Sequence, residues 1–391
     1  VFVLATDGVY DFVEPAFVAA TIRNAADLDA AARTIGLEAL ARGSDDNLTI
    51  QIVRIDEAPR GAAGDALKTP TDLPPPPMLE ARQEFDGYRI VRRLHASARS
   101  HIYLAEDIAS GAIVALKAPS IDLRDDPGYI KRFMLEEWVA RRLSSAHVLK
   151  PSPVERKRNF LYVAFEYVDG QTLAQWMLDH PKADLGSVRG IVDQVARGLL
   201  AFHRKEMVHQ DLRPANVMID RTGTAKIIDF GSTRVAGVAE AASAEANAEI
   251  LGTVQYTAPE YFLGEGGSAR SDVYSLAAIA YHMLTGRLPY GAQAAHARTR
   301  AQMKKLAYTP ALDDNSDIPA WVDGALRKAL DPDPEKRFGD PMEFAFALRN
   351  PVIGAPPSRM IERDPLKFWK IVSAGLALAV VALAFLLVRR S

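Results

Sequence analysis

Five side chains in this sequence occur at spacings that would suit the transfer of a phosphoryl group. Lys117 ends the apolar run "VALK", from which an ammonium could reach the phosphates of a nucleotide, and Glu136 follows nineteen residues later as a possible partner. In "HQDLRPAN", Asp211 is a candidate base for a substrate hydroxyl, and Asn216 can offer an amide oxygen to a divalent ion. Asp229 in "IIDFG" is a candidate second metal ligand. Each residue alone is as readily a solvated side chain, a turn or a helix cap, but the ordered set predicts phosphate chemistry.

The elements that must position these residues fall into two groups within residues 85–350. The first, to about residue 168, contains short runs rich in β-branched residues, such as "YRIVRRL", "HIYLAED" and "AIVALKAP", and one segment with helical spacing at 129–143. In residues 169–350 the long segments are mostly helical. The pattern predicts an α+β fold with a small β-rich lobe, a large α-helical lobe and a cleft between them.

The order of motifs along residues 88–348 resembles that of eukaryotic-type serine/threonine protein kinases, a family with bacterial members. "VALK" is similar to the family's third-strand lysine motif, "EYVDGQTL" to its hinge, and "DFG" and "GTVQYTAPE" to the two ends of its activation segment. The resemblance implies a bilobal kinase fold that binds ATP and Mg²⁺ and transfers the γ-phosphate to serine or threonine hydroxyls of protein substrates. The residues that it implies for contact with ATP are Ile102, Ala115, Lys117, Glu166, Val168, Met218 and Ser97.

The resemblance also implies roles around the reacting groups. Asp211 would be the base, and Asn216 and Asp229 would hold Mg²⁺. Lys117, positioned by Glu136, would stabilise charge on the phosphates. Arg213 stands where these kinases have a lysine that contacts the transferred phosphate. The residues implied to have structural or regulatory roles are Gln210, Thr253, Glu260, Asp272 and Arg337.

Three features depart from the family pattern. His95, Ser97 and Ser100 occupy the positions of glycines that let backbone amides close over phosphates, although a serine hydroxyl can itself donate to phosphate. Gln210 replaces an arginine that receives a phosphorylated activation loop. Arg213 replaces the family's lysine, so a planar guanidinium stands where these kinases have a compact ammonium group. Two functions therefore remain open: an active kinase, or a catalytically impaired pseudokinase that acts as a membrane-tethered signalling scaffold.

Residues 1–55 carry a second pair of candidate metal ligands. Asp7 in "LATDGVYDFV" and Asp46 in "GSDDNLTIQIV" each lie beside a predicted strand, with two predicted helices between them. Alone, each is an ordinary turn or cap. Together they resemble the C-terminal end of type 2C metal-dependent protein phosphatases, which implies a partial phosphatase β-sandwich whose aspartates ligate Mn²⁺ or Mg²⁺. Because the rest of that fold would come first, we expect a truncated bifunctional phosphatase/kinase whose phosphatase fragment is inactive as given.

Two linkers and an apolar segment complete the predicted organisation. Residues 56–84, which include "LPPPPML", form a Pro-, Ala- and Gly-rich linker, and residues 351–369 form a second linker. The run "IVSAGLALAVVALAFLLV" contains eighteen residues without a charge, roughly 27 Å as a helix. With Trp369 before it and arginines after it, the run predicts a single-pass transmembrane helix at 370–389. A buried core helix is the alternative, but the run is apolar on every face. Use of ATP implies that the kinase domain faces the cytoplasm, and the family analogy favours a bacterial inner membrane.

The composition excludes some classes of partner and site. With 47 basic and 49 acidic residues and a formal net charge of -2, the chain gives no reason to expect a nucleic-acid partner. It has no cysteine, which excludes disulfides and thiolate metal sites. The protein substrate, the activating signal and the oligomeric state stay open at this level.

Overall fold

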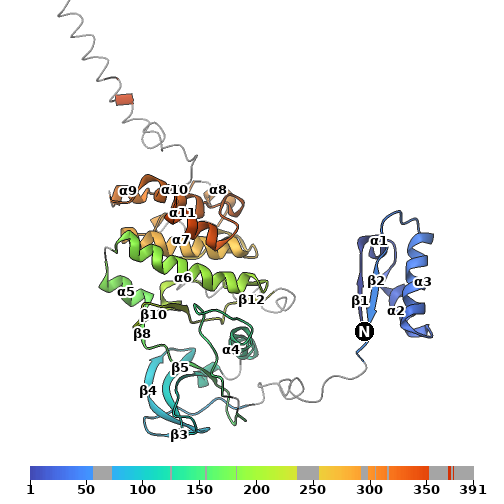
Figure 1. Cartoon of the computed structure of the whole chain (residues 1–391), viewed down its shortest axis with the longest axis horizontal. Coiled ribbons are helices and arrows are strands. Elements are labelled where there is room, and N and C mark those ends of the chain that lie inside the picture. Colours follow the sequence, from blue (N-terminus) through green and yellow to red (C-terminus); the bar gives the residue numbers. More distant parts are fainter. Residues whose placement is uncertain are drawn as a thin grey trace, which may run out of the picture. The chain divides into compact units, whose positions relative to one another are not determined.

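The chain forms two compact units, Val1–Asp72 and Leu73–Ser391, and each is described by itself (Figure 1). The computed structural model describes residues 1–55, 73–123, 126–154, 156–181, 183–235, 255–291, 298–303, 305–314, 317–351, 369–370 and 373.

The first unit packs helices against a two-stranded antiparallel sheet. In that sheet Phe2 pairs with Val53 and Ala5 pairs with Ile50. Its elements are β1 (Phe2–Ala5), α1 (Asp7–Tyr10), α2 (Pro15–Asn24), α3 (Leu28–Ala41) and β2 (Ile50–Val53). Its small core consists of Val9, Val13, Ile35 and Ala39. The predicted order of strand, two helices and strand is present, with the short helix α1 in addition, around few buried side chains.

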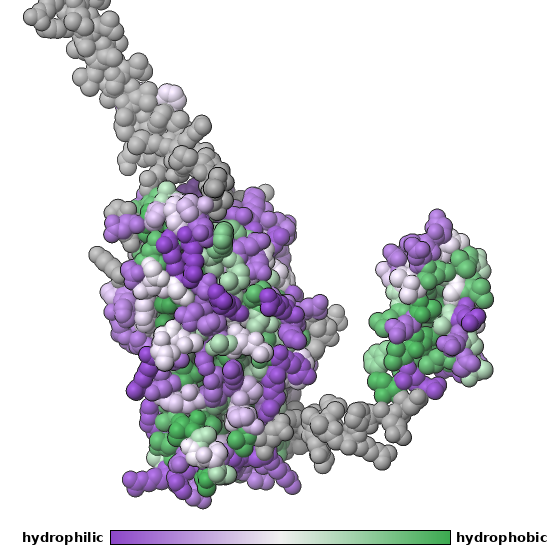
Figure 2. All heavy atoms as spheres, in the orientation of Figure 1, coloured by the Kyte–Doolittle hydropathy of each residue, from purple (hydrophilic) through white to green (hydrophobic). Residues whose placement is uncertain are grey.

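Large apolar side chains stay exposed on this first unit. Phe2 and Leu4 of β1, and Leu37 and Leu40 of α3, are all more than half exposed to solvent. Figure 2 shows that apolar surface occupies much of the visible face of the unit. Contiguous exposed apolar surface is unusual for a complete soluble domain, because covering such surface is the main stabilising contribution to folding.

The second unit begins with a five-stranded antiparallel sheet in the order β3-β4-β5-β6-β7. Its strands are β3 (Glu84–Phe85), β4 (Tyr88–Ala96), β5 (Ser100–Asp107), β6 (Ile113–Pro119) and β7 (Val163–Glu166). Leu116 lies in a core cluster with Tyr103 and Tyr162. Successive residues of a strand face opposite sides, so Lys117 points away from that cluster.

Helix α4 (Pro127–Ala140) is the single long helix among the described residues of this lobe. The carboxylate of Asp126 caps it by accepting the N–H of Tyr129 at 2.9 Å, and Pro127 occupies the first turn. These signals start the helix two residues before the predicted segment 129–143. Its buried face, which includes Ile130 and Phe133, joins the large core of the unit.

The segment before β3 lies against the same lobe. The N–H of Leu161 donates to the carbonyl of Pro74 at 2.9 Å. Leu79 is buried, and its N–H donates to the hydroxyl of Tyr103 at 3.4 Å. Within the predicted linker 56–84, the residues from Leu73 onward therefore belong to the second unit, and 56–72 lie outside the described residues.

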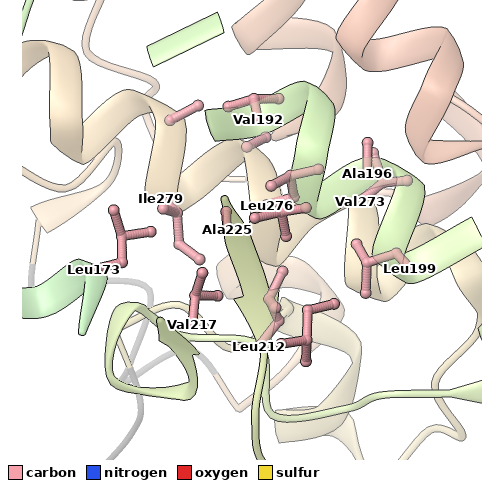
Figure 3. Close-up of a cluster of buried hydrophobic side chains, with 14 of the residues drawn as sticks. Leu173, Val192, Ala196, Leu199, Leu212, Val217, Ala225, Val273, Leu276 and Ile279 are labelled. Carbon is pink, nitrogen blue, oxygen red and sulfur yellow. The ribbon is translucent and has the colours of Figure 1, made fainter. Parts of the chain in front are cut away.

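The larger lobe is built around helices α6 (Leu185–His203) and α7 (Ala269–Thr285) (Figure 1). Asp184 caps α6 by accepting the N–H of Ser187 at 2.9 Å. Figure 3 shows Val192 and Leu199 of α6 and Leu276 of α7 gathered around the strand that carries Ala225. One short element, η2 (Ile121–Leu123), lies between β6 and α4. The elements that follow β7 are β8 (Gly170–Thr172), α5 (Leu173–Asp179), α6 (Leu185–His203), β9 (Met207–Val208), η3 (Pro214–Asn216), β10 (Val217–Asp220), β11 (Ala225–Ile227), β12 (Arg234–Val235), η6 (Pro259–Leu263), α7 (Ala269–Thr285), α8 (Arg300–Met303), α9 (Ala311–Asp314), α10 (Ala320–Ala329), η8 (Pro334–Lys336) and α11 (Pro341–Arg349).

In the part of the chain that the structure describes, no helix is both long and apolar enough to cross a bilayer. The predicted transmembrane segment 370–389 lies outside the described residues except at positions 370 and 373, and the predicted linker 351–369 lies outside them except at its two ends.

Candidate active site

Lys117 and Glu136 form the central ion pair of the site. The lysine Nζ lies 2.6 and 2.7 Å from the two carboxylate oxygens of Glu136, which is 5% exposed. The same Nζ lies 3.6 Å from Oδ1 of Asp229. Burial works to lower the pKa of Lys117, but the carboxylates of Glu136 and Asp229 outweigh it and raise that pKa above its ordinary value. Lys117 is thus held as a fixed cation by groups from two other segments.

Asp272 positions the backbone of the loop that carries Asp211. Its carboxylate accepts the N–H of His209 at 3.0 Å and the N–H of Gln210 at 3.1 Å. It also accepts a bond from Nε2 of His203 at 2.8 Å. Gln210 has φ of +68°, a conformation that residues with a Cβ rarely adopt. The buried carboxylate therefore stabilises a left-handed residue immediately before Asp211.

Asp211 and Asn216 are joined by hydrogen bonds. The Asn216 amide nitrogen donates to the Asp211 carbonyl at 2.8 Å and to its Oδ2 at 3.0 Å. The guanidinium Nε of Arg213 lies 3.5 Å from the same Oδ2. Burial raises the pKa of Asp211 above its ordinary value, although Arg213 opposes that rise. A carboxylate whose protonated form is favoured in this way is suited to accept a proton.

Asp229 lies two residues beyond β11, close to Asn216. The N–H of Ile228 donates to the carbonyl of Asn216 at 3.0 Å, which joins the two segments. Desolvation works to raise the pKa of Asp229, but the ammonium of Lys117 and the N–H of Gly231 outweigh it and lower that pKa. A Cβ at position 231 would lie 2.8 Å from Oε1 of Glu136, so a larger residue there would have to displace that carboxylate.

Asn216 and Asp229 fit the ligand preference of Mg²⁺. The amide nitrogen of Asn216 is committed to Asp211, so its oxygen is the atom that can act as a ligand. The lowered pKa keeps Asp229 ionised near neutral pH. Mg²⁺ in nucleotide sites takes one or two protein oxygens and completes its shell with phosphates and water. When bound, it would place positive charge on the phosphate oxygens.

Strand register places Ile102, Ala115, Lys117 and Glu166, four of the predicted ATP-contact residues, on adjacent strands of the five-stranded sheet. Ile102 of β5 pairs with Lys117 of β6, and Ala115 pairs with Phe165 of β7. Glu166 is the last residue of β7, and Val168 lies two residues beyond it. Met218, also predicted to contact ATP, lies in β10. Phe165 also lies 6.4 Å from the ring of Phe230, centroid to centroid. Phe165 thus contacts the phenylalanine of "DFG".

The positions that lack glycine form a closed turn. Ser97 Oγ donates to the carbonyl of Ser100 at 3.1 Å and accepts the N–H groups of Arg99 (3.3 Å) and Ser100 (3.1 Å). We call residues 97–100 the serine turn. His95 is paired with Ile102 in the β4–β5 hairpin. The Ser97 hydroxyl, which the sequence suggests as a phosphate donor, is used inside the turn.

Of the predicted structural residues, Glu260 and Arg337 form a buried bidentate pair with two contacts of 2.8 Å. Thr253 lies outside the described residues. Sequence reasoning missed three contacts: the Tyr129 hydroxyl with the Arg99 carbonyl, His203 with Asp272, and Ser271 with Glu260. No local motif marks them, because each joins segments that are distant in sequence.

In the first unit, the segments of Asp7 and Asp46 lie side by side. A Cβ added to Gly8 would lie 3.3 Å from the Cβ of Asp46 and 3.0 Å from the carbonyl of Asn47. Each carboxylate accepts the N–H of the residue that follows it. Within the described ranges, no group of three or more His, Cys, Asp or Glu side chains is arranged to hold a metal.

The fold and this site define the class of protein. A β-rich lobe with a buried Lys–Glu pair, next to a helical lobe with an Asp–Asn–Asp set, is the architecture of a phosphotransferase. The family model for the protein kinase domain matches residues 88–350. The chain belongs to the protein kinase family, and its kinase domain is of the bacterial serine/threonine type, a transferase. The bilobal α+β fold that the sequence predicts is confirmed.

Individual relatives give the degree of similarity. The chain is 29% identical over 266 residues to serine/threonine-protein kinase PrkC of Bacillus subtilis, a match that covers 67% of this chain and 40% of that protein. It is 32% identical over 277 residues to serine/threonine-protein kinase PknB of Mycobacterium leprae, covering 70% of this chain and 44% of that protein. The crystal structure of the Mycobacterium tuberculosis PknI kinase domain shares 30% identity with a TM-score of 0.54, covering 70% of this chain and all of that one. The chain thus spans less than half the length of the first two relatives.

Proposed function

We propose that the second unit is an active ATP-dependent serine/threonine kinase. The observation that supports this most directly is the contact of Lys117 with both Glu136 and Asp229, at 2.6 and 3.6 Å, next to the bonded pair Asp211 and Asn216. Phosphoryl transfer requires a cation for the phosphates, a base for the acceptor hydroxyl and oxygen ligands for metal ions. Each of these groups is present and held by a second residue.

In this proposal Asp211 accepts the proton of a serine or threonine hydroxyl. That oxygen bonds to the γ-phosphorus while the bond to the β–γ bridging oxygen breaks, and ADP leaves. The raised pKa of Asp211 favours proton acceptance. Lys117 and Arg213 stabilise negative charge on the phosphate oxygens. Asn216 and Asp229 would hold the metal, which would add positive charge at the phosphate oxygens.

Incubation of the full chain with Mg-ATP and a generic protein substrate tests the proposal. The wild type and the surface variant Asp179→Asn should label serine or threonine, and Asp211→Asn should be slower by about a hundredfold or more. Asp179 is an exposed helix residue that accepts a bond from Gln175, so it controls for loss of one carboxylate. Equal, background labelling by all three chains contradicts kinase activity.

A pseudokinase scaffold is the second candidate, and the serine turn favours it. Three Cβ-bearing residues replace the glycines, and the Ser97 hydroxyl is already bonded within the turn. Thermal melting with and without Mg-ATP separates the cases. A chain that is stabilised by Mg-ATP but transfers no phosphate is a nucleotide-binding pseudokinase, and a chain that is not stabilised is a pseudokinase without nucleotide.

We also propose that residues 370–389 anchor the protein in a bacterial inner membrane with the kinase domain in the cytoplasm. The support is the uncharged run of eighteen residues and the basic residues on both sides of it. The full chain should stay with membranes after alkaline carbonate extraction, and a chain that ends at Trp369 should not. Release of the full chain by carbonate contradicts the anchor.

For the first unit we propose a phosphatase origin. The support is the adjacency of the Asp7 and Asp46 segments, together with the exposed apolar surface expected of a sandwich that lacks its second sheet. The complete protein would then carry kinase and phosphatase activities. Sequencing the DNA upstream of the codon for Val1 tests this proposal, because that DNA should encode further acidic metal ligands and additional strands. An upstream sequence without them contradicts the proposal.

A further inference from the structure

The serine turn is closed by its own hydrogen bonds. Ser97 Oγ makes three bonds within residues 97–100, and the Ser97 N–H donates to the carbonyl of Ser100 at 3.0 Å. A glycine-rich loop is mobile because its residues lack Cβ atoms. This turn is instead held in one shape, so its distance from the phosphate site depends on what holds it from outside.

Two groups outside the turn hold the carbonyl of Arg99. The N–H of Ser120, just after β6, donates to it at 2.7 Å. The hydroxyl of Tyr129, in the first turn of α4, donates to the same oxygen. Tyr129 is 8% exposed. Burial raises the pKa of Tyr129 to about 12, so its hydroxyl stays protonated and able to donate at neutral pH.

The helix that supplies Tyr129 also supplies Glu136. Residues 129, 133 and 136 follow the spacing of one helix face, and all three are buried. Tyr129 and Phe133 contact one another with ring centroids 6.3 Å apart. At the far end of this face Glu136 holds Lys117 at 2.6 Å. The position of α4 therefore sets both the cation that faces the phosphates and the turn that would close over them.

We propose that Tyr129 is a positioning residue for ATP: by holding the Arg99 carbonyl it keeps the serine turn at the distance from α4 that phosphate binding requires. This rests on the proposed kinase function. It explains how a loop without glycines can serve a nucleotide site. It also implies that a movement of α4 that breaks the Lys117–Glu136 pair removes the Tyr129 bond to the Arg99 carbonyl at the same time, while the Ser120 N–H can still hold that carbonyl.

Tyr129→Phe in the full chain tests the proposal, because it removes the hydroxyl and keeps the ring. Tyr281→Phe is the matched control, since the Tyr281 hydroxyl donates to the carbonyl of Thr309 at 2.9 Å in the other lobe. Tyr129→Phe should raise KM for ATP about fivefold, the size of one ordinary hydrogen bond, with kcat changed less than about twofold. Tyr281→Phe should change neither. Melting curves establish that both variants are folded.

Titration with fluorescent mant-ATP measures the affinity for the nucleotide directly, without turnover. Tyr129→Phe should weaken binding about fivefold. An unchanged KM and an unchanged mant-ATP affinity overturn the role of Tyr129, as does an equal effect of Tyr281→Phe. If the wild type binds mant-ATP but labels no more substrate than Asp211→Asn, the proposed transferase function fails, and the titration still decides the role of Tyr129. A wild type that binds no nucleotide overturns both proposals.

Combination with Ser97→Ala tests whether the two residues act on one loop. Each single change should raise KM for ATP, and the double variant should raise it by less than the product of the two effects, because both hold the same turn. An effect equal to the product means that Tyr129 and Ser97 act independently, and overturns the proposed linkage through the serine turn.

Discussion

Replacing Glu260 by glutamine should destabilise the kinase unit strongly, although Glu260 is not one of the reacting groups. The residue pairs with Arg337, whose side chain is 0% exposed, while that of Glu260 is 4% exposed. All five guanidinium N–H groups of Arg337 have acceptors: two carboxylate oxygens of Glu260 and the carbonyls of Asp331, Arg270 and Pro332. Glu260→Gln keeps the shape of the side chain and removes its charge.

The magnitude follows from the burial of the arginine. Removing one partner of a buried ion pair costs about 3–5 kcal/mol, because the other charge stays in the interior without compensation. In addition, the hydroxyl of Ser271 loses the charged acceptor that it now contacts at 2.6 Å. A domain of this size loses roughly 2–4 °C in melting temperature per kcal/mol, so we expect a decrease of about 6–20 °C.

The chain offers a matched control in which the ion-pair distance is the same and the burial differs. Arg270 contacts Glu335 at 2.8 Å, but the side chain of Glu335 is 82% exposed. Glu335→Gln should therefore cost no more than about 1 kcal/mol. Comparison of the two variants separates the contribution of burial from that of distance.

Urea unfolding followed by tryptophan fluorescence is the suitable assay. The four tryptophans of the chain, Trp138, Trp176, Trp321 and Trp369, all lie in the second unit, so excitation of tryptophan reports that unit alone. If Glu260→Gln unfolds within about 1 kcal/mol of the wild type, or no earlier than Glu335→Gln, then the Arg337 charge is not buried as described and the reasoning fails.

Three further predictions concern the site and its support. Asp211 has a raised pKa in the folded chain, so its ionisation costs stability above that pKa, and the cost disappears as pH falls below it. Asp211→Asn should therefore melt no lower than the wild type at pH 7, with any gain lost in acid; a lower melting temperature at pH 7 contradicts this. Gly170→Ala should cost about 1–3 kcal/mol in urea unfolding, because its Cβ would lie 2.0 Å from the carbonyl of Ile219; a neutral substitution would show that β8 can move. Chelation with EDTA should stop phosphate transfer and Mg²⁺ should restore it, and Asp229→Asn should raise the Mg²⁺ concentration for half-maximal rate; an unchanged Mg²⁺ dependence removes Asp229 as a ligand.

Part of the candidate site could be predicted from sequence because its spacing is local. Asp211 and Asn216 are five residues apart within one loop, and their hydrogen bonds occur within that loop. Lys117 could be placed on a strand and Glu136 on a helix from periodicity, and their spacing suggested the pair that the family resemblance also implies. The start of α4 was missed by two residues, because the cap at Asp126 is a local signal that the hydrophobic pattern does not contain.

The surroundings of these groups could not be predicted in the same way. The serine turn depends on which atoms Ser97 meets once β4 and β5 have paired, and a hydroxyl can bond equally well to phosphate or to backbone. The docking of the segment from Leu73 onward depends on an apolar surface that exists only after the lobe has formed.

The sequence by itself determined the kinase family, the two lobes and the five candidate site residues, since ordered motifs and apolar periodicity are properties of short segments. Tertiary structure alone decided how those side chains are held. The bonds of Tyr129 to Arg99, His203 to Asp272 and Ser271 to Glu260 join separate elements. Such contacts depend on strand register and helix packing, which arise from burial of the whole core and leave no pattern at the positions that finally meet.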